Sequence, residues 1–70
     1  MHRYEFVIRW SDEDKAYIAE APDLPGCVAH GDTSFAAAAN INEAIQLWLD
    51  TAREFGDPIP EPRNWQLVPA

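Results

Sequence analysis

The order of the secondary structure follows from residues 16–31, which read AYIAEAPDLPGCVAHG. The two short apolar runs at residues 16–21 and 27–31 are typical of extended strands. Between them two prolines remove backbone N–H donors, and Gly26 permits a positive φ. The chain is therefore predicted to reverse direction over residues 22–26 and to return as a neighbouring strand.

The segment before this stretch predicts one more strand. Residues 3–10 alternate in side-chain character, and that period of two is typical of a half-buried strand. One side carries Tyr4, Phe6, Ile8 and Trp10, and the other carries Arg3, Glu5, Val7 and Arg9. Residues 11–15 are polar turn formers, so this strand and residues 16–21 are predicted to form a hairpin.

A long helix is predicted from residue 34 to residue 55. Asp32, Thr33 and Ser34 are alternatives for its N-cap, because each can accept a hydrogen bond from the first free amides. At about 100° per residue, one broad apolar face carries Ala38, Ile41, Ala44, Ile45, Trp48, Leu49, Ala52 and Phe55. The helix is predicted to end at Gly56, which tolerates the left-handed cap, with Pro58 just beyond.

The remaining residues complete a single α+β domain over residues 1–70. Residues 58–62 are rich in proline and predict a stiff, extended connector, and residues 65–68 predict a last strand. The order β-β-β-α-β gives a two-layer sandwich, with an antiparallel sheet and one long helix across one face. The other face of the sheet, which includes Val7, needs a cover.

The composition favours association with other proteins. In a chain of 70 residues, one cysteine cannot form an internal disulfide, and with two histidines it does not supply the four ligands of a structural zinc site. Support from a second copy, in a homodimer or a tetramer, is therefore expected. The net charge of −7 disfavours direct nucleic-acid binding and attracts basic partners. No membrane span or signal peptide is recognisable, which predicts a cytoplasmic protein.

Catalytic groups, metal sites and cofactors are not expected. Cys27 and His30 lie three residues apart, a spacing that points side chains to opposite faces of a strand. The acidic run at residues 12–14 lacks the glycine and the terminal glutamate of a calcium-binding loop. The sequence therefore argues against an enzyme.

Four large apolar residues bear on the core and on interfaces. Trp10 and Trp48 belong to the predicted buried faces. Trp65 follows the connector, and two alternatives stay open for it: folding back on the domain, or anchoring a second copy. Leu47 lies among acidic helix residues, away from the apolar face, and is a candidate contact residue.

Residues 17–33, YIAEAPDLPGCVAHGDT, resemble the HicB family of antitoxins and the short proteins grouped with it. The resemblance continues in the helix, with Asn40 and then Glu-Ala-Ile at residues 43–45, and in Ile-Pro-Glu-Pro at residues 59–62. It covers nearly the whole chain. The residues that match the structural motif of the family are Pro22, Pro25, Gly26, Gly31, Asp32, Thr33 and Asn40.

The resemblance implies a fold akin to a trimmed ribonuclease-H-like unit without its catalytic carboxylates. It also implies binding to HicA, a small basic toxin that cleaves messenger RNA with a histidine, and inhibition by covering that active site. Family members often carry a C-terminal DNA-binding segment. The sequence stops at Ala70, so operator binding by this chain alone is not expected. Phe35 stands where the family often has a glutamate, which makes it a candidate exposed anchor.

Contact with a partner is expected at Asp23, Leu24, Phe35 and Leu47, and contact between copies at Val7, Trp65 and Leu67. A purely structural role is the alternative for residues 22–26, because Asp23 can bond its own downstream amides and Leu24 can plug the end of the sheet. The alternative function is a stand-alone homo-oligomeric scaffold whose partner is not a ribonuclease.

Overall fold

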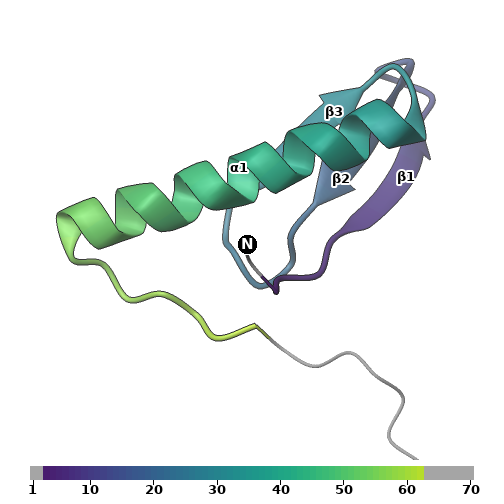
Figure 1. Ribbon diagram of the computed structural model, residues 1–70. Coiled ribbons are helices and arrows are strands. Elements are labelled where there is room, and N and C mark those ends of the chain that lie inside the picture. The colour runs from purple at the N-terminus through teal and green to yellow at the C-terminus, as the bar shows by residue number, and fades with distance from the viewer. Residues whose placement is uncertain (1–2, 63–70) are drawn as a thin grey trace, which may run out of the picture.

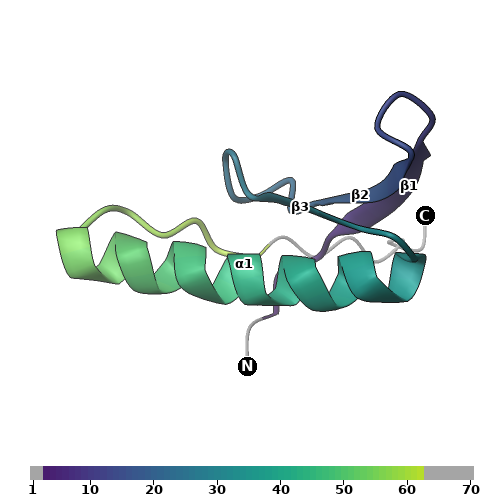
Figure 2. The same cartoon turned by 90° about the horizontal axis from the view of Figure 1, so that it is seen from above.

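The computed structural model describes residues 3–62 as three strands followed by one long helix (Figure 1). The elements are β1 (Val7–Ser11), β2 (Ala16–Glu20), β3 (Val28–Gly31) and α1 (Ser34–Phe55). Both strand pairs are antiparallel, and the strand order in the sheet is β1-β2-β3. The helix forms one layer and the strands lie in the other (Figure 2). The predicted α+β class, with one long helix on one face of an antiparallel sheet, is confirmed.

The first strand is shorter than its alternating sequence predicted. Pairing begins at Val7, which lies opposite Glu20, the last residue of β2. Beyond that point the Ala21 N–H is donated to Cys27 O at 3.0 Å, and Pro22 has no N–H to offer. The strand therefore begins at Val7, four residues later than predicted. The alternation nevertheless predicted burial of Tyr4, whose side chain is only 9% exposed.

The helix has the predicted bounds, and local caps explain both ends. The side chain of Thr33 caps the first turn, with Oγ1 accepting from the Ala36 N–H at 2.9 Å. At the other end Gly56 has a φ of 69°, and the Asp57 N–H is donated to Ala52 O at 2.8 Å. This arrangement is a Schellman motif, which only a residue free to adopt positive φ closes without strain.

The core lies between α1 and the sheet. The buried helix residues are Ala37, Ile41, Ile45, Leu49 and Ala52. Phe55 was expected on this face but is 71% exposed, because the last turns of α1 extend beyond the strands (Figure 1). Trp10 was also expected in the core and is 50% exposed. The helix packs most extensively on β3 and least on β1, so the outer strand is left partly uncovered.

Gly31 allows the helix to approach β3 closely. A Cβ atom at this position would lie 2.5 Å from the Ala37 N and 2.8 Å from the Ala36 C, both in the helix backbone. A second tie lies nearby, where Asn40 Nδ2 donates to His30 O at 2.7 Å. The start of α1 is therefore fixed against β3 by a close contact and a hydrogen bond.

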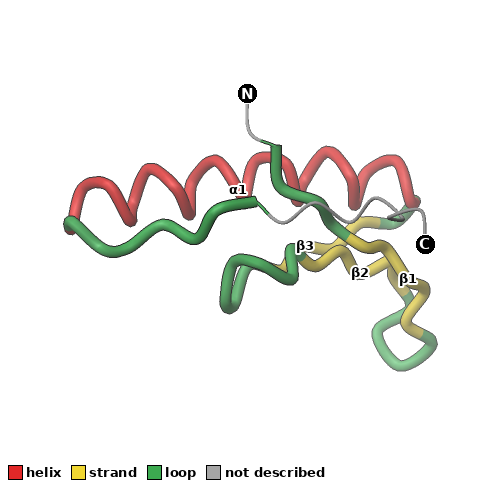
Figure 3. Tube along the Cα trace, turned by 90° about the horizontal axis from the view of Figure 1, so that it is seen from below, coloured by secondary structure: helices red, strands yellow, loops and turns green. Residues whose placement is uncertain are grey.

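The chain turns back after α1 and runs alongside it (Figure 3). Ile59 packs against the core, and the Tyr4 hydroxyl donates a hydrogen bond to Pro60 O. The predicted connector at residues 58–62 is therefore attached to the domain. The predicted strand at residues 65–68, which includes Trp65 and Leu67, lies outside the described residues.

Candidate protein-binding surface

The reversal at residues 22–26 points its central side chains inward. The Leu24 N–H is donated to Ala21 O at 3.1 Å, and Leu24 O accepts from the Cys27 N–H at 3.0 Å. Leu24 is 1% exposed and Asp23 is 8% exposed. Both were expected to contact a partner, and this burial removes them from the accessible surface. The backbone bonds turn Leu24 into the core, as in the structural alternative for this loop.

Trp48 holds the loop against the helix. Its indole Nε1 donates to Pro25 O at 3.0 Å, across 23 positions of sequence. The sequence placed Trp48 on the buried face but gave no sign of this bond, since nothing local marks a carbonyl as the partner of a distant indole. Through it, the exposed prolines of the loop keep a fixed position beside α1.

A groove with a volume of about 610 Å³ opens between the loop, the helix and the returning chain. We call it the proline groove. The prolines along its wall are Pro25, Pro58 and Pro60, and the helix contributes Ala44, Leu47, Trp48 and Thr51. The lining is mostly apolar, and Asp57 is the acidic residue in it. Apolar grooves that carry a few polar groups are the usual form of a binding site.

Two predicted contact residues are exposed, but they lie far apart. Leu47 is 67% exposed and lines the proline groove, whereas Phe35 is 84% exposed in the first turn of α1. Twelve residues of helix separate them by about 18 Å, at 1.5 Å per residue. The structure therefore does not gather the four expected contact residues into one patch. Val28, which sequence reasoning did not single out, is 51% exposed and lines the groove with Leu47.

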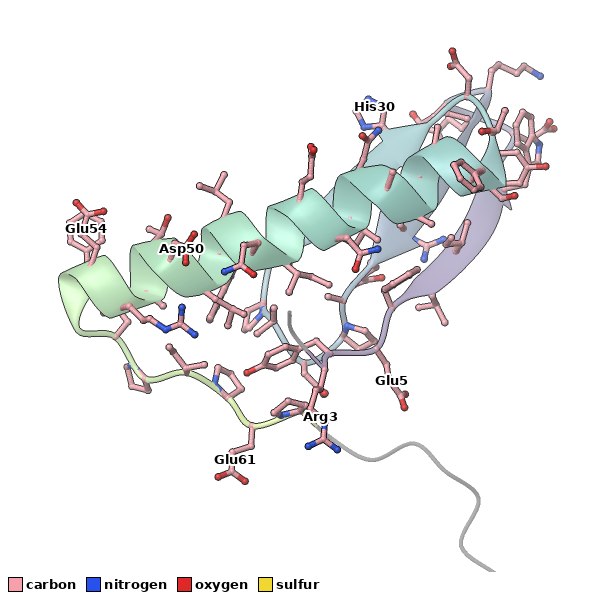
Figure 4. All side chains as sticks on the ribbon, viewed as in Figure 1. Arg3, Glu5, His30, Asp50, Glu54 and Glu61 are labelled. Carbon is pink, nitrogen blue, oxygen red and sulfur yellow. The ribbon has the colours of Figure 1, made fainter. Side chains whose placement is uncertain are left out.

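Negative charge is concentrated in the C-terminal half of α1 and in the returning chain after it. Residues 43–61 contain Glu43, Asp50, Glu54, Asp57 and Glu61, with Arg53 as their one basic residue. Asp50 and Glu54 project from the exposed side of α1, and Glu61 projects from the returning chain (Figure 4). Arg53 Nη1 lies 3.4 Å from Asp50 Oδ1. The net charge of this segment is −4, more than half of the −7 of the chain.

The sheet face opposite α1 is open among the described residues. The strand register places Val7, Glu20 and Val28 in one row across this face. Val7 is 54% exposed, and its expected place at an interface between copies stays a prediction. Arg9 Nη1 lies 3.5 Å from Glu20 Oε1, so the face combines exposed valines with an ion pair.

The residues considered for catalysis do not form a site. Cys27 is 3% exposed, and its burial raises the pKa of the thiol above the ordinary value of 9.0, so it is less nucleophilic than a free cysteine. His30 is exposed and points away from the core (Figure 4). Asp12 Oδ1 accepts from Lys15 Nζ at 3.5 Å within the hairpin loop. Across residues 3–62, no three His, Cys, Asp or Glu side chains are placed to hold a metal ion.

Comparison with known proteins places the chain in a family. Residues 4–68 match the family described as HicB-like antitoxin of bacterial toxin-antitoxin systems. The chain belongs to this family. A UPF0150 protein of Thermoplasma acidophilum is 39% identical over 54 residues, which cover 77% of the chain and 78% of that protein. Two UPF0150 proteins of Synechocystis are 41% and 36% identical, over 71% and 83% of the chain and 74% and 75% of their own lengths.

The HicB-like motif residues lie mainly where β3 meets α1. Gly31 provides the close approach, Thr33 caps the helix and Asn40 bonds the His30 carbonyl. Gly26 has a φ of 77° at the end of the reversal. In this HicB-like chain Gly31, Thr33 and Asn40 therefore carry structural contacts, while the motif residue Pro25 lines the proline groove. Within the part of the chain that the structure describes, no helix is long and apolar enough to cross a bilayer.

Proposed function

We propose that this chain neutralises a small basic RNA-cleaving toxin of the HicA type by binding over its active site. Membership of an antitoxin family supports the toxin as partner, and the charge of the chain supports a basic one. In this proposal the chain acts by occlusion, without catalysis of its own, and in the cytoplasm, where messenger RNA is found. The observation that carries it is a largely apolar groove within an acidic segment of a member of an antitoxin family.

The physical basis is competition between carboxylates and RNA phosphates. A protein that cleaves RNA needs a positive surface to hold the backbone. The acidic groups of residues 43–61 are attracted to the same surface, and their long-range attraction accelerates encounter. Burial of apolar groove residues then slows dissociation. Inhibition is therefore competitive with RNA, and the association rate falls as salt rises.

Two assays test this proposal. The chain is co-expressed with a small basic protein of the HicA type, and growth is compared with that of cells expressing the basic protein alone. In the second assay the purified basic protein cleaves a labelled RNA, and the chain is titrated in at low and at high salt. We expect growth to be restored and cleavage to stop near equimolar chain. Full cleavage at low salt with excess chain contradicts the proposal.

A second role rests on the open sheet face. We propose that Val7 is covered by another copy of the chain, in a homodimer or a tetramer, because the sheet face that carries Val7 is open and this side chain is half exposed there. If RNA cleavage is unaffected while the chain forms a stable assembly, the alternative of a homo-oligomeric scaffold with a different partner is favoured. Light scattering of the wild-type chain and of Val7→Lys distinguishes a monomer from an assembly made through this face.

A further inference from the structure

The proline groove is held open by contacts within the chain. The bond from Trp48 Nε1 to Pro25 O fixes one wall, and the bond from the Tyr4 hydroxyl to Pro60 O fixes the other. Both walls are therefore in place without a ligand. A groove that is already shaped requires little ordering on binding, so more of the contact energy appears as affinity.

The apolar surface continues past the groove. A second hollow of about 410 Å³ lies along the side of α1 nearer its start, and it shares Val28, Ala44 and Leu47 with the proline groove. It extends to Asn40, while the groove extends to Asp57 at the end of the helix. From residue 40 to residue 55 the helix covers about 22 Å. Since an extended chain spans about 3.3 Å per residue, this surface is long enough for about seven residues.

Leu47 and Val28 form the ridge between the two hollows. Their exposed fractions are 67% and 51%, which leaves two branched apolar side chains in solvent on the same border. Covering such side chains is favourable in proportion to the apolar area removed from water. A large apolar side chain placed in the proline groove beside Leu47 would cover the ridge and the prolines together.

The charges around this surface select a cationic occupant. Asp57 lies in the groove lining, and Glu43 lines the second hollow beside Leu47. No hydrogen bond or ion pair within residues 3–62 occupies either carboxylate. A second copy of the chain would bring an equally acidic segment against this one, and that repulsion disfavours self-docking here.

We propose that the proline groove and the hollow beside it bind an extended, basic segment of a partner protein, with one large apolar side chain in the groove and Lys or Arg on either side. The proposal rests on the proposed function in one respect: the segment belongs to the toxin. The apolar side chain contacts Leu47, Trp48 and Pro58, and the flanking cations pair with Glu43 and Asp57. Leu47 is thus the residue on which binding depends most among the exposed ones.

A model peptide tests the recognition chemistry without the toxin. The probe is a labelled seven-residue peptide with a central tryptophan and three lysines on each side, and its binding is followed by fluorescence anisotropy at low salt. Two matched probes replace the tryptophan with serine or the lysines with glutamates. We expect binding of the first probe alone, with amide chemical-shift changes around residues 43–58. Changes confined to the open sheet face around Val7, or equal binding of all three probes, overturn the proposal.

Matched variants test the site in the same assay. Leu47→Ala removes the ridge and Thr51→Tyr fills the groove from its rim, and both positions are exposed, so the fold is retained. We expect each to weaken peptide binding by about tenfold or more, as for a central contact residue. Gln46→Ala, a control that truncates an exposed side chain next to Leu47 in sequence but outside the lining of both hollows, should bind as the wild-type chain does. Equal losses in Leu47→Ala and Gln46→Ala contradict the assignment.

Co-expression separates this inference from the proposed function. If the wild-type chain restores growth and both groove variants restore it equally well, the docking surface is wrong and the antitoxin function stands. If the wild-type chain does not restore growth, the antitoxin function fails, and so does the assignment of the segment to the toxin. Loss of rescue in both groove variants, with rescue kept in Gln46→Ala, supports the docking surface.

Discussion

The contact between Gly31 and α1 predicts that Gly31→Ala destabilises the domain severely. The added Cβ would lie 2.5 Å from the Ala37 N, whereas ordinary contact begins at 3.4 Å, so the helix must move by about 0.9 Å. The same shift away from β3 lengthens the bond from Asn40 Nδ2 to His30 O from 2.7 Å to about 3.6 Å, which is beyond hydrogen-bond range.

The steric clash and the lost hydrogen bond together give the expected loss of folding stability. Overpacking costs about 1–3 kcal/mol, and the loss of a hydrogen bond costs about 1 kcal/mol. The sum, about 2–4 kcal/mol, is comparable with the entire stability of a domain of this size, which is about 3–5 kcal/mol. Because the free energy of unfolding falls by about 1 kcal/mol for each molar of urea, this loss lowers the urea concentration at the unfolding midpoint by about 2 M or more. The mutant is therefore expected to be partly unfolded at low urea.

The measurement is urea unfolding followed by far-ultraviolet circular dichroism, at equal chain concentrations because self-association adds to apparent stability. Gly26→Ala is the matched control. Nothing lies within 4 Å of its Cβ, so only the φ of 77° opposes the change, at a cost of about 1–2 kcal/mol. A Gly31→Ala midpoint within experimental error of the wild type, or above that of Gly26→Ala, would show that the helix does not press on β3 here.

Three further results are expected. Trp48→Phe loses the indole bond to Pro25 O, and the melting temperature should fall by about 4–8 °C for a loss of about 1 kcal/mol; an unchanged melting curve would mean that the bond contributes nothing. Leu24→Ala, at a 1% exposed core position, should cost about 2–5 kcal/mol and remove most far-ultraviolet helix signal; a folded variant that only loses its partner would restore Leu24 as a contact residue. Burial raises the pKa of the Cys27 thiol above 9.0, so the thiol of the unfolded chain loses its proton at a lower pH than that of the folded chain. The free energy of unfolding should therefore fall as pH rises above 9.0, and Cys27→Ala should flatten this decline. Parallel pH curves for the two chains would contradict this contribution of Cys27.

Local sequence signals predicted the helix and the reversals because their causes are local. The N-cap at Thr33 and the left-handed Gly56 lie within one turn of the ends that they define. The reversal at residues 22–26 follows from its own prolines and glycine. Such features need no knowledge of where the rest of the chain lies.

The site depends on contacts that no local pattern encodes. The sequence left two alternatives open for Leu24, a contact with a partner or a plug at the end of the sheet, and only the tertiary packing shows that it belongs to the core. Trp10 fitted the buried side of its strand, yet the helix covers that strand least. The proline groove combines residues from positions 25 to 60, so its existence follows from the tertiary fold alone.

The bond between the Tyr4 hydroxyl and Pro60 O has a consequence for the timing of synthesis. It joins residues 56 positions apart, and contacts of such separation form late because a long loop must close first. On a ribosome, the hairpin and most of α1 emerge before Pro58 and Pro60, which make the far wall of the proline groove. A nascent chain therefore presents an unfinished groove until residue 60 has left the exit tunnel. Chains whose translation stops before that point lack this wall of the groove.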